Sequence, residues 1–84
     1  MRYHELLETA NIIDVTGLSE DNLGYPKFPQ EFVTRRDWCE ENCKGAYDIQ
    51  PIRDSMMRLT GRSFRFKSHV DAVLFKLRFE TRLT

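Results

Sequence analysis

The sequence predicts an α+β fold, in which a small three-stranded antiparallel sheet has two or three short helices packed on one face. Two stretches near the C-terminus, Ser63–Lys67 and Phe75–Leu83, alternate apolar with polar residues, as half-buried strands do. Between them, Ser68 precedes apolar residues at helical spacing, which indicates a short helix. The 84 residues, of which 40% are hydrophobic and 31% charged, suit a single folded domain, residues 1–84, with a small core.

The first half of the chain is expected to hold two helices and a loop. Apolar side chains recur at helical spacing near residues 3–12, which predicts an N-terminal helix. Residues 19–29 contain a glycine and two prolines in a polar context and are expected to form a loop. Thr34 and Asp37 have the spacing of a capping box, so a second helix is predicted over residues 34–43.

Two strands and an ambiguous connection follow. Tyr47–Ile52 predicts a strand, which Pro51 ends or confines to a sheet edge because proline has no amide hydrogen. Residues 53–61 fit either a helical turn or a hairpin, and the hairpin is favoured. The alternating pattern makes Arg62–Lys67 the second strand.

The last quarter is expected to contain a helix and the third strand. Ser68 and Asp71 form a second capping-box pattern, in which Asp71 reaches back to the Ser68 amide, so a helix is predicted near residues 69–75. The alternation that begins at Phe75 predicts the third strand over Lys76–Arg82. An apolar helix stripe is formed by Val70, Val73, Leu74 and Leu77. The expected core residues are Trp38, Phe64, Phe66, Val73, Leu74, Leu77 and Phe79.

The net charge of zero conceals an asymmetry that bears on function. Residues 1–50 hold five basic and ten acidic side chains, whereas residues 51–84 hold eight basic and three acidic ones. In the predicted strands the phenylalanines lie opposite the cations, which argues against an aromatic stacking platform for RNA. We therefore expect a protein-binding module for a partner with an acidic or strand-presenting surface, with phosphate contacts to nucleic acid as the alternative. The candidate binding residues are Arg62, Arg65, Lys67, Lys76, Arg78, Arg82, Tyr25 and Phe28.

No enzymatic activity, metal site or cofactor is expected. Cys39, Cys43, His4 and His69 are residue types that bind zinc, but their spacing lacks the two close pairs of a zinc knuckle. No local signature supports a catalytic cysteine, and the four glycines stand apart, which argues against a phosphate-binding loop. No apolar run approaches the roughly 18 residues of a membrane span, and the acidic N-terminal residues argue against a secretory signal. A reducing cytoplasm with two free thiols is the expected setting.

Two segments of the second half carry a further pattern. One is Phe64-x-Phe66 followed by Asp71-Ala72-Val73-Leu74-Phe75-Lys76-Leu77-Arg78-Phe79, and the other, upstream, is Trp38-Cys39-Glu40-Glu41-Asn42-Cys43. Together they resemble small uncharacterised proteins encoded by tailed bacteriophages, over about half of the chain. The resemblance implies the cytoplasm of an infected bacterium and an accessory protein that binds and redirects host machinery. It brings no catalytic residues.

Overall fold

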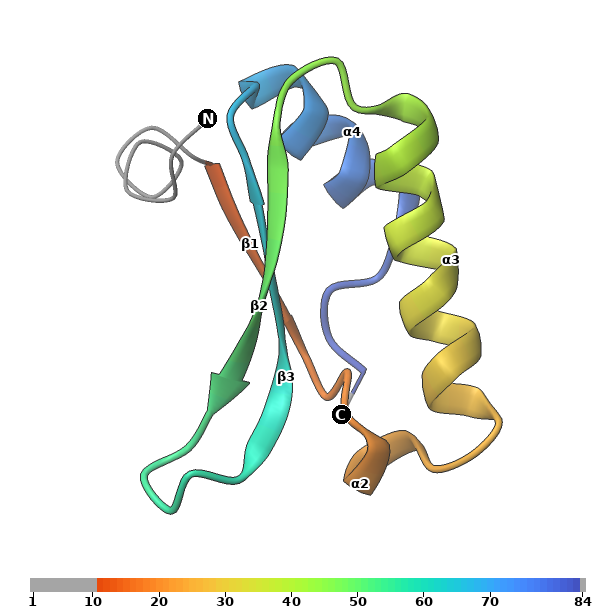
Figure 1. Cartoon of the computed structure of the whole chain (residues 1–84), viewed down its shortest axis with the longest axis vertical. Coiled ribbons are helices and arrows are strands. Elements are labelled where there is room, and N and C mark those ends of the chain that lie inside the picture. The colour runs from red at the N-terminus through yellow and green to blue at the C-terminus, as the bar shows by residue number, and fades with distance from the viewer. Residues whose placement is uncertain (1–10, 84) are drawn as a thin grey trace.

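The computed structural model describes residues 11–83, which form a three-stranded antiparallel sheet with helices on one face (Figure 1). The elements in chain order are strand β1 (Asn11–Thr16), helix α2 (Glu20–Leu23), helix α3 (Lys27–Asn42), strand β2 (Tyr47–Arg53), strand β3 (Leu59–Phe66) and helix α4 (His69–Arg78). The strand order is β1-β3-β2, and both outer strands run antiparallel to β3. The predicted α+β fold class is confirmed.

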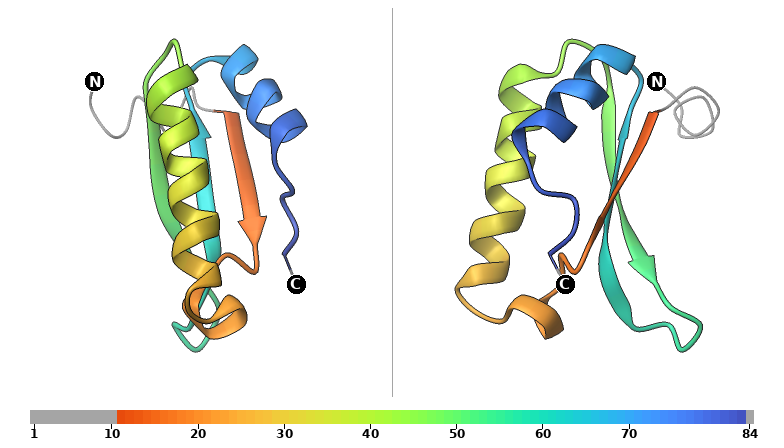
Figure 2. Two further views of the ribbon diagram at one scale, coloured as in Figure 1. Left: turned by 90° about the vertical axis from the view of Figure 1, so that its right-hand side faces the viewer. Right: turned by 180° about the vertical axis from the view of Figure 1, so that it is seen from behind.

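The two longer helices cover the same face of the sheet. Viewed onto this face, α3 crosses in front of β2 and β3, and α4 lies beside β1 (Figure 2). Phe64 and Phe66 of the central strand point toward the helices and are fully buried, as the alternation predicts. The buried hydrophobic core of the described residues comprises Val15, Leu18, Phe28, Cys39, Phe64, Phe66, Ala72 and Phe75.

The third strand is β1, which the sequence did not predict. It pairs with β3 from Asn11 opposite Phe66 to Thr16 opposite Gly61. The expected helix near residues 3–12 therefore does not extend through Asn11, and residues 3–10 lie outside the described part of the chain. β-branched residues dominate this strand, and Val15 points into the core, so alternation and propensity agree with the structure.

The predicted strand Lys76–Arg82 is wrong, because α4 continues to Arg78. Phe75 and Phe79 lie four residues apart, which places them on the same side of a helix, and both rings contact the Trp38 ring edge-on. Packing of these two rings against the core accounts for the apparent alternation, and it leaves Leu77 outside the core. Beyond the helix, the chain makes a single parallel bridge between Arg82 and Thr16.

Helix α3 begins earlier than predicted because its first turn accommodates a proline. The helix starts at Lys27, and Pro29 occupies the first turn, where amides have no intrahelical acceptor to lose. The predicted loop at residues 19–29 is therefore the short helix α2 followed by the first turn of α3. Thr34 is not an N-cap, since its Oγ1 donates to the carbonyl oxygen of Gln30 at 2.7 Å within the helix.

A hairpin joins β2 to β3, which confirms the favoured prediction for residues 53–61. Asp54 organises the turn: its Oδ1 accepts from the amides of Met56 and Arg58 at 2.8 and 3.0 Å, and its Oδ2 accepts from Arg58 Nε at 2.9 Å. The Arg58 amide, above all, holds the pKa of this carboxyl below its usual value. Strand β2 is an edge strand, as Pro51 predicted.

The N-terminus of α4 is capped by Ser68 but not by a complete capping box. Ser68 Oγ accepts from the Asp71 amide at 3.3 Å, as predicted. The Asp71 carboxylate does not reach back to Ser68; it turns toward the α3–β2 connection, where Oδ2 accepts from the amides of Lys44 and Gly45 at 2.9 and 3.0 Å. With only 1% of its surface exposed, Asp71 fixes α4 to that connection.

The predicted core is correct for its aromatic members and wrong for its aliphatic ones. The aromatic members lie in the core or pack against it: Phe64, Phe66, Trp38 and Phe79. The aliphatic members are exposed: Val73 by 42%, Leu74 by 46% and Leu77 by 79%. The fully buried ring of Phe75 explains the difference, because its centroid lies 4.7 Å from that of Phe64 and 5.2 Å from that of Phe66. Packing this ring orients the helix so that its aliphatic side faces solvent.

After α4, the chain returns along the outer edge of β1 (Figure 2). The Thr16 amide donates to the Thr81 carbonyl oxygen at 3.0 Å, and the Leu83 amide donates to the Thr16 carbonyl oxygen at 2.8 Å. Arg35 of α3, 3% exposed, anchors the same segment through a hydrogen bond from Nη2 to the Glu80 carbonyl oxygen at 3.0 Å. The C-terminal segment is thus held by both α3 and β1.

Candidate functional site

Helix α4 carries an apolar surface that the fold leaves uncovered. Of the eight large hydrophobic residues that are exposed among residues 11–83, four belong to this helix. They follow the spacing i, i+3, i+4, i+7 and are 42–79% exposed: Val70, Val73, Leu74 and Leu77, here called the α4 stripe. Contiguous exposed apolar patches are uncommon on monomeric proteins and mark interaction surfaces.

The opposite side of α4 is firmly attached to the rest of the fold. Asp71, Ala72 and Phe75 are its buried residues, at 1%, 3% and 0% exposure. The Phe75 ring lies within 4.7–5.8 Å of four other aromatic ring centroids, and Asp71 accepts two backbone hydrogen bonds. The α4 stripe is therefore presented on a rigid support, which limits the entropy lost when a partner binds.

A cation borders the α4 stripe on each side. Lys76 lies toward β1, where it lines a groove with that strand. Arg78 lies toward α3, where it lines a shallow pocket with Trp38, and its guanidinium carbon is 5.0 Å from the Phe79 ring centroid. The single carboxylate within α4 is that of Asp71, which is buried. The exposed surface of this helix is therefore apolar and basic.

A groove of about 260 Å³ lies between α4 and the edge of β1. It is lined by Asn11, Ile12, Ile13, His69, Ala72, Val73 and Lys76. One end is closed by a polar contact between His69 Nδ1 and Asn11 Oδ1 at 3.1 Å. Because residues 3–12 were predicted to form a helix, no groove beside a strand was predicted here from the sequence. The β-branched run in NIIDVT was the sequence signal that would have revealed β1.

The six basic residues predicted as a binding face do not share one sheet face. Arg62 turns inward, donates from Nη1 to the Leu18 carbonyl oxygen at 3.0 Å, and lies over the Phe28 and Phe32 rings. Its burial holds its pKa below the usual value and gives it a structural role. Arg65 lies between Phe64 and Phe66 on β3, and successive side chains of a strand point to opposite faces. Its side chain therefore projects from the sheet face opposite the helices.

The remaining four predicted cations are exposed, but only two lie on a common element. Lys76 and Arg78 belong to α4 and border its stripe, whereas Lys67 follows the end of β3 and Arg82 lies in the C-terminal segment. The structure thus brings the predicted cations Lys76 and Arg78 together with an apolar surface that was expected to be core.

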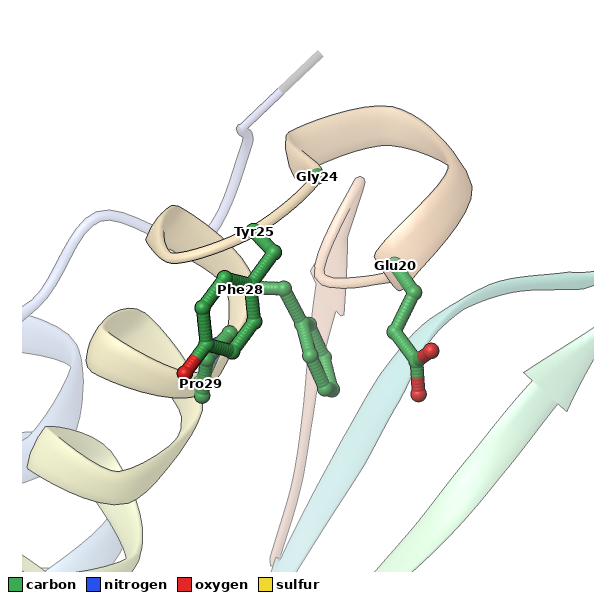
Figure 3. A pocket seen from close by; sticks show the side chains of 5 residues that line it. All are labelled: Glu20, Gly24, Tyr25, Phe28 and Pro29. Carbon is green, nitrogen blue, oxygen red and sulfur yellow. The ribbon is translucent and has the colours of Figure 1, made fainter.

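The predicted aromatic pair lies at the α2 end of the molecule, away from the start of α4 (Figure 1). Tyr25, which precedes a cis peptide bond to Pro26, is 91% exposed. Phe28, 9% exposed, does join the core. The two rings line an open pocket of about 490 Å³ with Glu20, Gly24 and Pro29 (Figure 3).

The two cysteines lie on α3 and in the cap that follows it, and both are free thiols. Burial raises the pKa of Cys39 well above its usual value, and burial together with the nearby Asp71 carboxylate raises that of Cys43 to about 11. Both are therefore protonated at neutral pH and are poor nucleophiles. Within residues 11–83, no three histidine, cysteine or acidic side chains cluster as metal ligands would, and His4 lies outside these residues.

Two general findings complete the description of the site. In the described part of the chain, none of the helices combines the length and the apolar character that crossing a bilayer requires. No protein-family model, curated protein or solved structure matches the chain.

Proposed function

We propose that this chain is a non-enzymatic protein-binding module, a phage-encoded accessory protein that binds and modulates a host protein in the bacterial cytoplasm. The observation that carries the proposal is the α4 stripe, whose four apolar side chains are 42–79% exposed on a helix that is anchored from behind. The resemblance of Trp38–Phe79 to tailed-phage proteins supports the biological setting.

The chemistry of α4 favours an acidic, amphipathic helix as the partner surface. An apolar stripe at helical spacing is complementary to the apolar face of another helix. Lys76 and Arg78 on its borders complement aspartate and glutamate on the rim of such a helix. Full burial of a leucine or valine side chain contributes about 1.5–3 kcal/mol, so the stripe offers enough free energy to offset part of the entropy of association.

The test is a pull-down from bacterial lysate with the tagged full chain, run with and without nuclease. We expect a stoichiometric protein band that survives nuclease and is lost with Leu77→Asn. The matched control is Met56→Asn, which removes an apolar side chain of similar exposure, 71% against 79%, from the β2–β3 hairpin. Equal capture by both variants would show that the partner does not contact the α4 stripe.

A second pair of variants tests the contribution of charge. Reversal of Lys76 and Arg78 to glutamate is expected to weaken capture, whereas Arg65→Glu, on the opposite face of the sheet, is expected to leave it unchanged. The alternative function, nucleic-acid binding, predicts that capture disappears with nuclease and that affinity falls steeply with salt. That result would replace the protein-binding proposal.

A further inference from the structure

The outer edge of β1 presents backbone groups that face away from the sheet. In an antiparallel ladder, the amide and carbonyl of one residue point the same way, and the direction alternates along the strand. Thr16 uses its outward groups to bind Thr81 and Leu83. Asp14 and Ile12, two and four residues earlier, must point outward as well, and no other described residue pairs with their backbone groups.

These outward groups border the groove between β1 and α4. Ile13, Ala72 and Val73 give the groove apolar walls, and Lys76 provides an exposed cation. One end is closed by His69 and Asn11, and the other end of the same strand edge is occupied by the C-terminal segment. The free length corresponds to about four residues of extended chain, at roughly 3.3 Å per residue.

We propose that this groove binds an acidic, extended peptide segment, which adds to β1 as a fourth strand of the sheet. The inference rests on the proposed function and adds a second contact on the same partner, an extended segment beside the helix that covers the α4 stripe. The C-terminal segment already forms a parallel bridge with Thr16, so the edge accepts another chain segment beside α4. The charged residue of the groove lining is Lys76, and the lining contains no carboxylate, which favours acidic peptide side chains.

A second copy of the chain fits this groove less well. Antiparallel pairing of two β1 strands about a two-fold axis places both α4 helices on the same side of the joined sheet. Their exposed surfaces carry cations and no carboxylate, so like charges approach one another. The opposite sheet edge is also unsuitable for strand addition, because Pro51 lies on the outward side of β2 and has no amide hydrogen to donate.

The probe is a library of random seven-residue peptides displayed on yeast and selected with the full-length chain. We expect enriched sequences that carry aspartate or glutamate and bind the wild type in a fluorescence-anisotropy titration with the synthetic peptide. Asp14→Pro removes one outward amide hydrogen and leaves the hydrogen bonds between β1 and β3 in place. We expect it to weaken peptide binding at least about fivefold. Lys76→Glu should also weaken binding, whereas Arg65→Glu should not.

A measurement on the peptide side does not depend on how the variants fold. In an added strand, every second peptide amide faces β1 and the others face solvent. N-methylation of the amides that face β1 should therefore abolish binding, and N-methylation of the other set should not. Failure to enrich peptides, equal binding of both methylated forms, or self-association that occupies the edge would each overturn the inference. Lysate capture that depends on Leu77 would persist in those cases, so the two proposals fail separately.

Discussion

Helices α3 and α4 cover the same sheet face but divide their surfaces in opposite ways. Helix α3 buries Phe28, Arg35 and Cys39 and turns a largely polar surface to solvent. Helix α4 buries an aspartate, an alanine and a phenylalanine, and it exposes four aliphatic side chains. The comparison shows that apolar spacing identifies a helix but does not say which side of it faces the core. Aromatic packing and buried polar anchors decide that orientation here.

The largest expected effect is the difference between two apolar truncations in α4. Phe75→Ala removes a fully buried ring and is expected to lower the free energy of unfolding by about 3–5 kcal/mol. Leu77→Ala removes a side chain that is 79% exposed and should change it by no more than about 0.5 kcal/mol. Urea denaturation of both variants provides the measurement. Similar losses of unfolding free energy in the two variants would mean that the α4 stripe is packed in the core. The contrast between α3 and α4 would then be false.

The second effect concerns the buried carboxylate of α4. Asp71→Ala leaves the Lys44 and Gly45 amides without their acceptor, and we expect a loss of about 2–3 kcal/mol. The control on α3 is Asp37→Ala, which removes an exposed carboxylate with one weak contact to Arg36 and should be nearly neutral. A neutral Asp71→Ala would show that α4 is held by its aromatic contacts alone.

Local patterns predicted the parts of the fold that depend on neighbours in sequence. The alternation around Phe64 and Phe66 identified β3, Ser68 identified the start of α4, and the turn residues before β3 favoured the hairpin. These features follow from strand period, capping and turn chemistry, which act over a few residues. The side chains that border the site, Lys76 and Arg78, were also found in this way, although the sequence placed them on a strand.

The rest depended on contacts between distant residues. The orientation of α4 follows from the place of the Phe75 ring beside Phe64 and from two amide donors that lie 26 and 27 residues before Asp71. Neither contact has a local signature, so the exposed α4 stripe was taken for core. Strand β1 gains its stability by pairing with β3, some fifty residues later, and was missed although its β-branched run is a local signal.

A smaller effect compares the two residues that the sequence predicted as N-caps. Ser68→Ala removes the acceptor for the Asp71 amide at the start of α4 and is expected to cost about 1 kcal/mol in unfolding free energy. Thr34→Ala lies in the interior of α3 and should be neutral or slightly stabilising, because alanine has the higher helix propensity. Chemical denaturation distinguishes the two, and a larger loss at Thr34 would contradict the observed start of α3.

The last effect is a pH dependence of stability at the C-terminal end of α3. Burial raises the pKa of Cys43 from 9.0 to about 11, so the folded protein keeps a proton that the unfolded chain releases. The resulting stabilisation is fully present below pH 9.0 and is lost as the pH rises toward about 11. The melting temperature of the wild type should therefore fall more steeply over this interval than that of Cys43→Ala. Equal slopes would mean that the end of α3 admits solvent and is packed more loosely than the anchored side of α4.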